Sequence, residues 1–157
     1  MLHGRSKILS RSYNSVVSKV PHVRKHSMSE AKLGETFPSV SYQLEPQAVE
    51  EYARFMAVTR PVSPSTNFVP PSMLAYYALW IASSHFGFDT RGALFASMDL
   101  QFEGLASDGD IITVQDSQVE DVFIRDGKRY IVLASISVNE QNQVLCRSKI
   151  TAVFKAT

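Results

Sequence analysis

One uncharged stretch constrains the fold of this chain more than any other. It runs from Pro70 to Gly87 as PPSMLAYYALWIASSHFG, and no charged residue occurs between Ser72 and Ser84. Its apolar side chains recur at helical spacing but cover nearly the whole circumference, so the predicted helix has to be covered on most sides. About four turns are too short to span a bilayer, which needs roughly 20 apolar residues. The stretch therefore predicts a central core helix.

The residues after this helix have the pattern of antiparallel strands. Turn signals separate them, and Asp126-Gly127 is the dipeptide that two-residue hairpins favour. A second turn is predicted at Ser107-Asp108-Gly109-Asp110, and a third at Glu140-Gln141-Asn142. Four segments show period-two alternation or are rich in β-branched residues: Leu94–Phe102, Ile111–Ile124, Arg129–Asn139 and Val144–Phe154. In the first of them we expect Phe95, Ser97, Asp99 and Gln101 on one face, and Leu94, Ala96, Met98, Leu100 and Phe102 on the other.

The residues before the central helix predict one strand, one helix and a loop. Ser39–Leu44 alternates like a strand, and apolar residues then recur at helical spacing from Pro46 to about Val58. Arg60–Pro70 contains three prolines and several small polar residues, which exclude regular structure. The order predicts an α+β domain in which a curved antiparallel β-sheet is wrapped around the central helix.

The first 27 residues differ from the remainder in charge. Met1–Ser27 contains six basic residues and no acidic one, which leaves a net charge of −5 for Met28–Thr157 because the whole chain carries +1. This composition is typical of a mitochondrial transit peptide, and Arg11 precedes Ser12-Tyr13 as in sites cut by matrix proteases. A disordered tail, or a true start at Met28, are the alternatives. We expect a single domain over residues 28–157, in the mitochondrial matrix if the extension is a transit peptide and otherwise in the cytoplasm.

The composition excludes several classes of function. A slightly acidic domain offers no broad basic surface to nucleic acid, and no segment is long enough to cross a membrane. One cysteine, Cys146, permits neither an internal disulfide nor a cysteine-built metal site, and we expect it to be a small core side chain. Three of the four histidines precede Met28, so His85 is the one histidine of the predicted domain. We expect no metal and no cofactor.

Several segments resemble the MaoC-type dehydratase and hydratase branch of the hot-dog fold. The resemblance covers roughly Leu33 to Phe154 and depends on the order and spacing of short motifs rather than on any one of them. These motifs are Gly34-Glu35-Thr36-Phe37, Tyr42-Gln43-Leu44-Glu45-Pro46, Val49–Ala53, Phe68-Val69-Pro70-Pro71, Leu100–Glu103, Gly109-Asp110, Val119–Phe123 and Gly127-Lys128.

The resemblance implies a function on acyl thioesters of coenzyme A or of acyl carrier protein. Catalytic members of the family add or remove water across the double bond next to the thioester carbonyl, with an aspartate and a histidine in a G-D-x-N-P-x-H segment as the acid–base pair. In this chain Thr59 falls near the position of the aspartate and Ser63 near that of the histidine. The sequence therefore lacks the acid–base pair at the place where the family has it.

Three other residues are candidates for catalysis. His85 lies at the end of the central helix, where a histidine is also explained by the helix dipole. Asp89 and Glu103 are carboxylates after that helix, as a single-carboxylate thioesterase would need, although Glu103 is equally explained as a solvated residue at a strand end.

The candidate substrate-binding residues lie in the loop and the central helix. Arg60 would pair with an anionic group and Asn67 would donate hydrogen bonds to a pantetheine arm, unless the loop is only a proline-stiffened connection. Ser72 is at the helix start, where the family places the backbone N–H groups that bind the thioester carbonyl. Tyr76 and Trp80 would line an acyl tunnel or belong to the core.

Three functions are compatible with these features. The first is an acyl-thioester-binding subunit without catalysis of its own, as a homodimer or paired with a motif-bearing hot-dog subunit. The second is an enzyme in its own right, either a thioesterase or an atypical dehydratase that uses Glu103 or Asp89. The third is a non-enzymatic protein that binds an apolar ligand. We prefer the first, because the acid–base pair is absent from its usual place.

Overall fold

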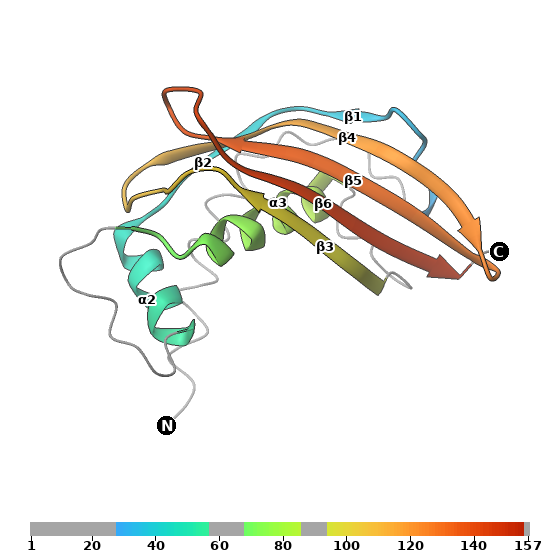
Figure 1. The fold of residues 1–157 in the computed structure, drawn as a ribbon, viewed down its shortest axis with the longest axis horizontal. Coiled ribbons are helices and arrows are strands. Elements are labelled where there is room, and N and C mark those ends of the chain that lie inside the picture. The colour runs from blue at the N-terminus through green and yellow to red at the C-terminus, as the bar shows by residue number, and fades with distance from the viewer. Residues whose placement is uncertain (1–27, 57–67, 86–93, 156–157) are drawn as a thin grey trace.

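The computed structural model contains one curved antiparallel sheet that arches over a helix (Figure 1). The structure describes residues 28–56, 68–85 and 94–155, and of residues 55–56 and 79–85 it describes the backbone alone. The prediction of a curved sheet wrapped around the uncharged helix is confirmed.

The helices and strands follow the predicted order, with two additions near the N-terminus. A short 3₁₀ helix, η1, and a two-residue strand, β1, precede the first predicted strand. The elements are η1 (Met28–Glu30), β1 (Thr36–Phe37), β2 (Val40–Gln43), α2 (Pro46–Met56), α3 (Pro71–His85), β3 (Leu94–Phe102), β4 (Ile111–Arg125), β5 (Lys128–Val138) and β6 (Val144–Lys155).

The strands form one antiparallel sheet in the order β1-β4-β5-β6-β3, with β2 also paired to β4. Consecutive strands β4, β5 and β6 are joined by short turns, and Asp126 and Gly127 at the first turn both have positive φ, 50° and 65°. These angles fit the type I′ hairpin that the dipeptide predicted. The strand after α3, β3, lies at one end of this order, and among the described residues its one pairing partner is β6.

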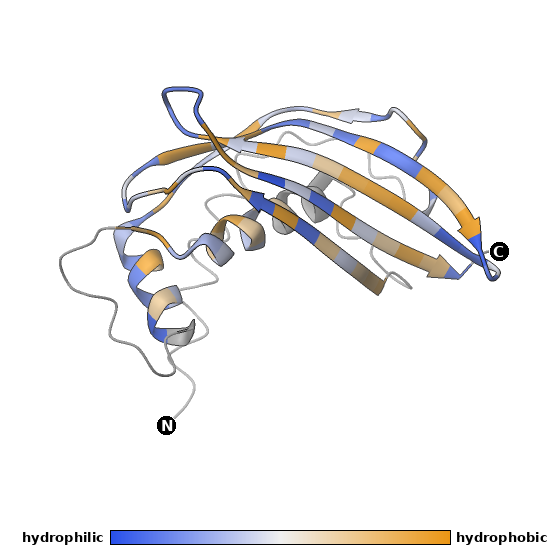
Figure 2. Ribbon diagram, viewed as in Figure 1, coloured by the Kyte–Doolittle hydropathy of each residue, from blue (hydrophilic) through white to orange (hydrophobic). Residues whose placement is uncertain are grey.

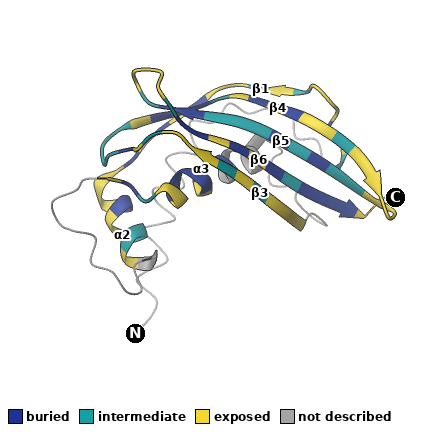
Figure 3. Cartoon of the chain, in the orientation of Figure 1, coloured by how far each residue is buried: buried dark blue, intermediate teal, exposed yellow. Residues whose placement is uncertain are grey.

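The two faces of the sheet differ in polarity, as the alternating colours along the strands in Figures 2 and 3 show. The concave face packs on α3 and carries buried apolar residues such as Ile131, Ile150 and Ala152. The convex face carries charged residues, among them Arg147 and Lys149. Because side chains alternate between faces, each strand contributes to both.

A band of serines divides the concave face into two apolar clusters. The first cluster lies around the start of α3 and includes Tyr42, Met73, Tyr77 and Val114, and the second lies farther along β5 and β6. Between the two clusters lie Ser117, Ser135 and Ser148. The hydroxyl groups of Ser135 and Ser148 share a hydrogen bond of 2.8 Å. The pairing satisfies two polar groups that would otherwise be costly to bury.

The predicted alternation of β3 is correct over most of its length and wrong at its start. From Ser97 onward, Met98 and Leu100 point to the concave face as expected, since they lie opposite Ile150 and Ser148. A β-bulge between Phe95 and Ser97 exchanges the faces of the residues before it. Leu94 is therefore on the convex side and Phe95 on the concave side, the reverse of the expectation.

An N-terminal strap, residues 28–35, completes the second apolar cluster. The side chain of Met28 is 1% exposed and packs against strand residues such as Val119 and Ile131. The strap is held by hydrogen bonds from the Gly34 amide to the Val119 carbonyl, 2.9 Å, and from the Arg129 guanidinium to the Ala31 carbonyl, 2.9 Å. No periodic pattern marks this segment in the sequence, because its buried residues, Met28 and Ala31, do not form a repeat.

Replacing Met28 with alanine is expected to destabilise the fold by roughly 2–5 kcal/mol, because a buried methionine is lost and a cavity remains. The measurement is urea unfolding of the full chain. The matched control is Leu33→Ala in the same strap, where the side chain is 68% exposed and the expected change is below about 0.5 kcal/mol. Equal losses in the two variants would contradict burial of Met28.

Candidate functional site

The start of α3 is fixed by contacts with the loop between β3 and β4. The Val69 amide donates to the Ala106 carbonyl at 2.8 Å, and Phe68 forms an isolated β-bridge with Ser107. The Met73 amide donates to the Pro70 carbonyl at 2.9 Å, which closes the first turn of the helix. The entry to α3 is thus anchored to the sheet before the helix begins.

The anchoring loop is itself held in place by backbone contacts. A Cβ atom at Gly104 would lie 2.9 Å from Leu145 Cδ2 and 3.3 Å from the Val144 carbonyl oxygen, so the buried Leu145 side chain would have to shift to admit it. Gly109, with φ of 86°, donates its amide to the Leu44 carbonyl at 2.6 Å. The Asp110 carboxylate accepts from the Ser107 amide at 2.8 Å and closes the predicted turn.

Ser72 lies in the exposed first turn of α3. Backbone N–H groups in a first helical turn lack partners within the helix, and the helix dipole adds a partial positive charge there. Pro71 has no N–H group and the Met73 amide already donates to the Pro70 carbonyl, so among residues 71–73 the Ser72 N–H group is the one left for a ligand. The start of α3 therefore provides an electropositive donor at an exposed position, where the family resemblance implies a carbonyl-binding site. The role of Ser72 itself stays a prediction.

A chain of four tyrosines follows the start of α3. The ring of Tyr42, on β2, stacks on that of Tyr77 with centroids 4.3 Å apart, and Tyr77 meets Tyr76 edge to face at 5.8 Å. Tyr76 in turn meets Tyr52 of α2 at 6.4 Å. The Tyr76 side chain is 46% exposed, so it lies at the solvent-facing rim of this group of tyrosines and not in the core.

The hydroxyl group of Tyr42 is buried without a hydrogen-bond partner in the described part of the chain. Burial raises the pKa of Tyr42 well above its usual range, with smaller contributions from Tyr77 and Cys146. Burial also raises the pKa of Tyr77, with further contributions from Tyr76 and from the Glu45 carboxylate. Both phenols therefore stay protonated at neutral pH and can donate hydrogen bonds but not accept protons.

Cys146 lies in the first apolar cluster and is 1% exposed, as predicted for a core cysteine. Burial, followed by the charge of Glu103, raises the pKa of its thiol to about 11. A thiol with this pKa is protonated at neutral pH and is a poor nucleophile.

The Glu103 carboxylate is engaged on the convex face of the sheet. It accepts from Arg147 Nε at 2.8 Å and from Gln101 Nε2 at 3.1 Å. Since α3 lies on the concave face, this position separates the carboxylate from the helix start. Glu103 as a general base stays a prediction, and its ion pair counts against it.

The remaining candidates are only partly described. Arg60, Asn67 and Asp89 lie outside the described residues, as do Thr59 and Ser63. Trp80 and His85 are in α3, with His85 as its last residue, and their side chains are outside the description. The structure thus brings Ser72 and Tyr76 together at the start of α3 and leaves the other assignments as predictions.

Two residues near the helix were missed by the sequence reasoning. From the sequence, Tyr42 was placed in a predicted strand without a role in the site. The alternation of that strand is the signal that could have indicated its burial, because Tyr42 shares a face with Val40. Glu45, exposed between β2 and α2, is close enough to Tyr77 for its charge to raise the pKa of that phenol. No spacing rule connects Glu45 with Tyr77, because they are 32 positions apart in the sequence.

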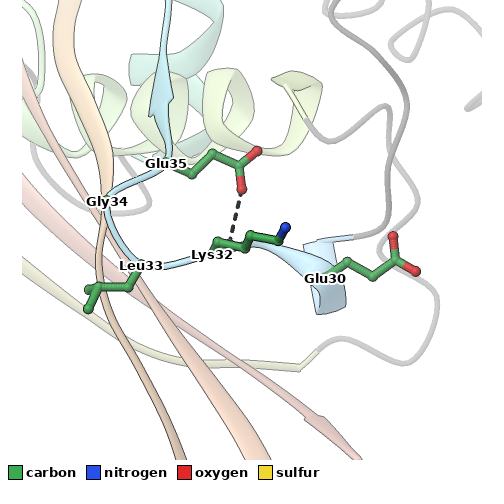
Figure 4. Close-up of a pocket in the computed structure, with 5 residues that line it drawn as sticks. All are labelled: Glu30, Lys32, Leu33, Gly34 and Glu35. Atoms are coloured by element: carbon green, nitrogen blue, oxygen red, sulfur yellow. Dashed lines mark hydrogen bonds between the residues drawn. The ribbon is translucent and has the colours of Figure 1, made fainter.

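An open pocket of about 570 Å³ lies along the N-terminal strap (Figure 4). It is lined by Glu30, Lys32, Leu33, Gly34 and Glu35, and the Lys32 amide donates to Glu35 Oε2 at 3.0 Å across it. Acyl chains bind in apolar, enclosed cavities. The charged lining of this pocket does not match that requirement.

Within residues 28–56, 68–85 and 94–155, no group of three histidine, cysteine, aspartate or glutamate side chains is arranged to hold a metal ion. In the same ranges, no helix has the length and apolar character that crossing a membrane requires.

Comparison with known proteins gives matches in structure and none in sequence. No family model matches the chain, and no curated protein does. The MaoC-like dehydratase from Rhodospirillum rubrum has 15% identity over 84% of this chain and 98% of its own length, with a TM-score of 0.66.

Two Mycobacterium tuberculosis complexes contain similar chains. The HadBC complex, a 3R-hydroxyacyl-ACP dehydratase, matches at 14% identity over 80% of this chain and 99% of that chain, with a TM-score of 0.65. The ChsH1–ChsH2 complex matches at 14% identity over 78% of this chain and 98% of that chain, with a TM-score of 0.62. The predicted hot-dog fold is confirmed.

Replacing Tyr42 with phenylalanine is expected to raise the free energy of unfolding by up to about 2 kcal/mol, because it removes a buried hydroxyl group without a partner. Thermal and urea unfolding measure the change. Tyr130→Phe on the convex face is the control and should be nearly neutral. A loss of stability in Tyr42→Phe alone would show that the hydroxyl group has a partner in solution.

Proposed function

We propose that this chain is an acyl-thioester-binding subunit of a MaoC-like enoyl hydratase or 3-hydroxyacyl dehydratase, and that it is not catalytic by itself. The substrate class is an acyl-CoA or acyl carrier protein thioester. The observation that carries the proposal is an exposed helix start with a backbone N–H donor at Ser72, in a chain without the family's acid–base pair at its usual place.

The electrostatic part of a thioester site is supported by the start of α3. Donors placed where negative charge develops on a carbonyl oxygen are among the largest contributions to catalysis of this kind. The anchoring of Val69 and Phe68 to the β3–β4 loop holds the segment from which the Ser72 N–H group projects. Because this donor belongs to the backbone, the site does not depend on the side chain at position 72.

The acid–base part has no counterpart at its usual place. Thr59 and Ser63 occupy the positions where the family has aspartate and histidine, and neither side chain transfers protons at neutral pH. Glu103 is paired with Arg147 on the opposite face. The hypothesis of an independent thioesterase therefore finds no support among the described carboxylates.

A partner subunit with the acid–base pair would complete the site. Two of the similar solved structures are complexes named for two components, HadBC and ChsH1–ChsH2. This supports a hot-dog partner for the chain: a motif-bearing relative would bring the acid–base pair, whereas a second copy of this chain would extend the sheet without bringing it.

The free edge of β3 is the surface best suited to such a partner. It spans nine residues, and Leu94, Phe95 and Phe102 on it are exposed large apolar side chains. The part of β4 after Gln118, which is not paired with β1 or β2, is protected against edge pairing. A bulge falls at Glu120, and the Asp121 side chain accepts a hydrogen bond from the neighbouring Val122 amide. Edge pairing through β3 would extend the sheet across two subunits.

Hydration assays with the purified, partner-free protein test the absence of catalysis. We expect no hydration of a 2-enoyl-CoA above the uncatalysed rate, because the acid–base pair is missing. Calorimetry with a non-hydrolysable acyl-CoA should nevertheless show binding. Turnover by the isolated protein would refute the non-catalytic role, and lack of any acyl-CoA or acyl carrier protein binding would refute the thioester site.

A pair of variants at Ser72 tests whether backbone donors make the site. Ser72→Pro removes one N–H group from a first turn, where proline is tolerated, and should weaken acyl-CoA binding by about tenfold. Ser72→Ala keeps the N–H group and should bind normally. Circular dichroism checks that the helix persists, and equal effects of the two variants would exclude a backbone site.

Adding lysines to the β3 edge is expected to prevent self-association. Ser97→Lys combined with Gln101→Lys places like charges on both strands of an antiparallel pair, where they repel. Sedimentation should show a shift from dimer to monomer. Gln118→Lys combined with Gln141→Lys adds the same charge away from the edge and serves as the control. If the β3 variant sediments as a dimer, this edge is not the interface.

A further inference from the structure

Three cations lie side by side at the end of the sheet that carries the β4–β5 hairpin. The register places Arg125 opposite Lys128, and Lys128 opposite Lys155, in one row across β4, β5 and β6. All three side chains are exposed on the convex face. Figure 1 shows this hairpin at the right-hand end of the sheet, beside the C-terminus.

Such a row destabilises the free protein. Like charges directly opposite each other on neighbouring strands repel, and no described carboxylate forms an ion pair with Lys128 or Lys155. Elsewhere on the convex face, cations are neutralised: Lys149 lies 2.7 Å from Glu120. In the row itself, only Arg125 has an acidic neighbour, Asp126, at 3.6 Å.

An apolar row runs parallel to the cations, two residues farther along the strands. Leu94 lies opposite Val153, Val153 opposite Tyr130, and Tyr130 opposite Phe123. The rings of Phe123 and Tyr130 stack with centroids 4.8 Å apart and an interplanar angle of 2°. Leu94 is 70% exposed and Phe123 38%, whereas Val153 between Leu94 and Tyr130 is 9% exposed, so the row presents apolar area to solvent mainly at its two ends.

We propose that these two rows form a docking surface for an acidic amphipathic helix of a partner protein. Neighbouring strands are about 4.8 Å apart, which is close to the roughly 6 Å between side chains one turn apart on a helix. A helix lying across the strands would set its acidic residues over Arg125, Lys128 and Lys155 and its apolar face over the stacked rings. The contact removes the repulsion within the cation row.

Two other anionic partners fit the surface less well. Asp126 projects from the hairpin tip with an 84% exposed side chain, which opposes insertion of this end into an anionic bilayer. Nucleic acid fits less well because the basic surface is limited to this one row, in a chain whose residues 28–157 carry a net charge of −5. The proposal does not depend on the thioester function, because the surface lies at the opposite end of the sheet from the start of α3.

Peptide binding tests the surface with the full chain. The probe is a synthetic helical peptide with glutamates along one face and leucines along the other, with a lysine version of the same peptide for comparison. Lys128→Glu combined with Lys155→Glu should weaken binding of the acidic peptide at least about tenfold. The matched control, Lys32→Glu combined with Arg54→Glu, changes the net charge equally and should bind as the wild type does.

A single variant separates docking from a structural role. Lys128→Glu turns the repulsive pair with Lys155 into an attractive one, so the melting temperature should rise while peptide binding falls. Failure of the wild type to bind the acidic peptide, or equal losses in both double variants, would overturn the proposal. Binding to phosphatidylserine vesicles but not to the peptide, abolished by Lys128→Glu with Lys155→Glu, would assign the surface to membranes instead and also overturn it.

Discussion

The whole arrangement depends on burying an uncharged helix. Met73, Leu74 and Tyr77 of α3 are at most 8% exposed, and only a strongly bent sheet can cover so much of one helix with the strands of a single domain. Bulges in β3 and β4 supply local bends, and serines on the concave face leave room for the helix to approach. The strands are consequently long, continuous and polar on their outer face.

This packing also places the proposed thioester site. The β3–β4 loop that closes the sheet is the same loop that receives Val69 ahead of α3, so the fold sets the position of the helix start without any catalytic side chain. Under the proposed function, the subunit can therefore keep a carbonyl-binding N–H group although the acid–base pair is absent from its usual place. The tyrosines beneath that start, with raised pKa values at Tyr42 and Tyr77, add hydrogen-bond donors but no base.

Local chemistry made much of the fold predictable. The uncharged segment predicted α3. Asp126-Gly127 predicted the β4–β5 hairpin, because the positive φ angles of such a turn favour these two residue types. The remainder depended on contacts distant in sequence. Nothing near Ala96 indicates the bulge that exchanges Leu94 and Phe95. Met28 is buried by strands about 90 or more residues later, and Glu103 is paired with Arg147, 44 positions away. Within the candidate site, only the helix start was accessible to sequence reasoning, because it is made by backbone.

The serine band gives the domain two parts that can open separately. Local unfolding proceeds through cooperative units, and units are separated where apolar contacts are interrupted. The hydroxyl pair of Ser135 and Ser148 interrupts the contacts between the cluster beneath the start of α3 and the one sealed by Met28. Opening of the cluster beneath the start of α3 can thus leave the strand amides around the cluster sealed by Met28 protected from hydrogen exchange.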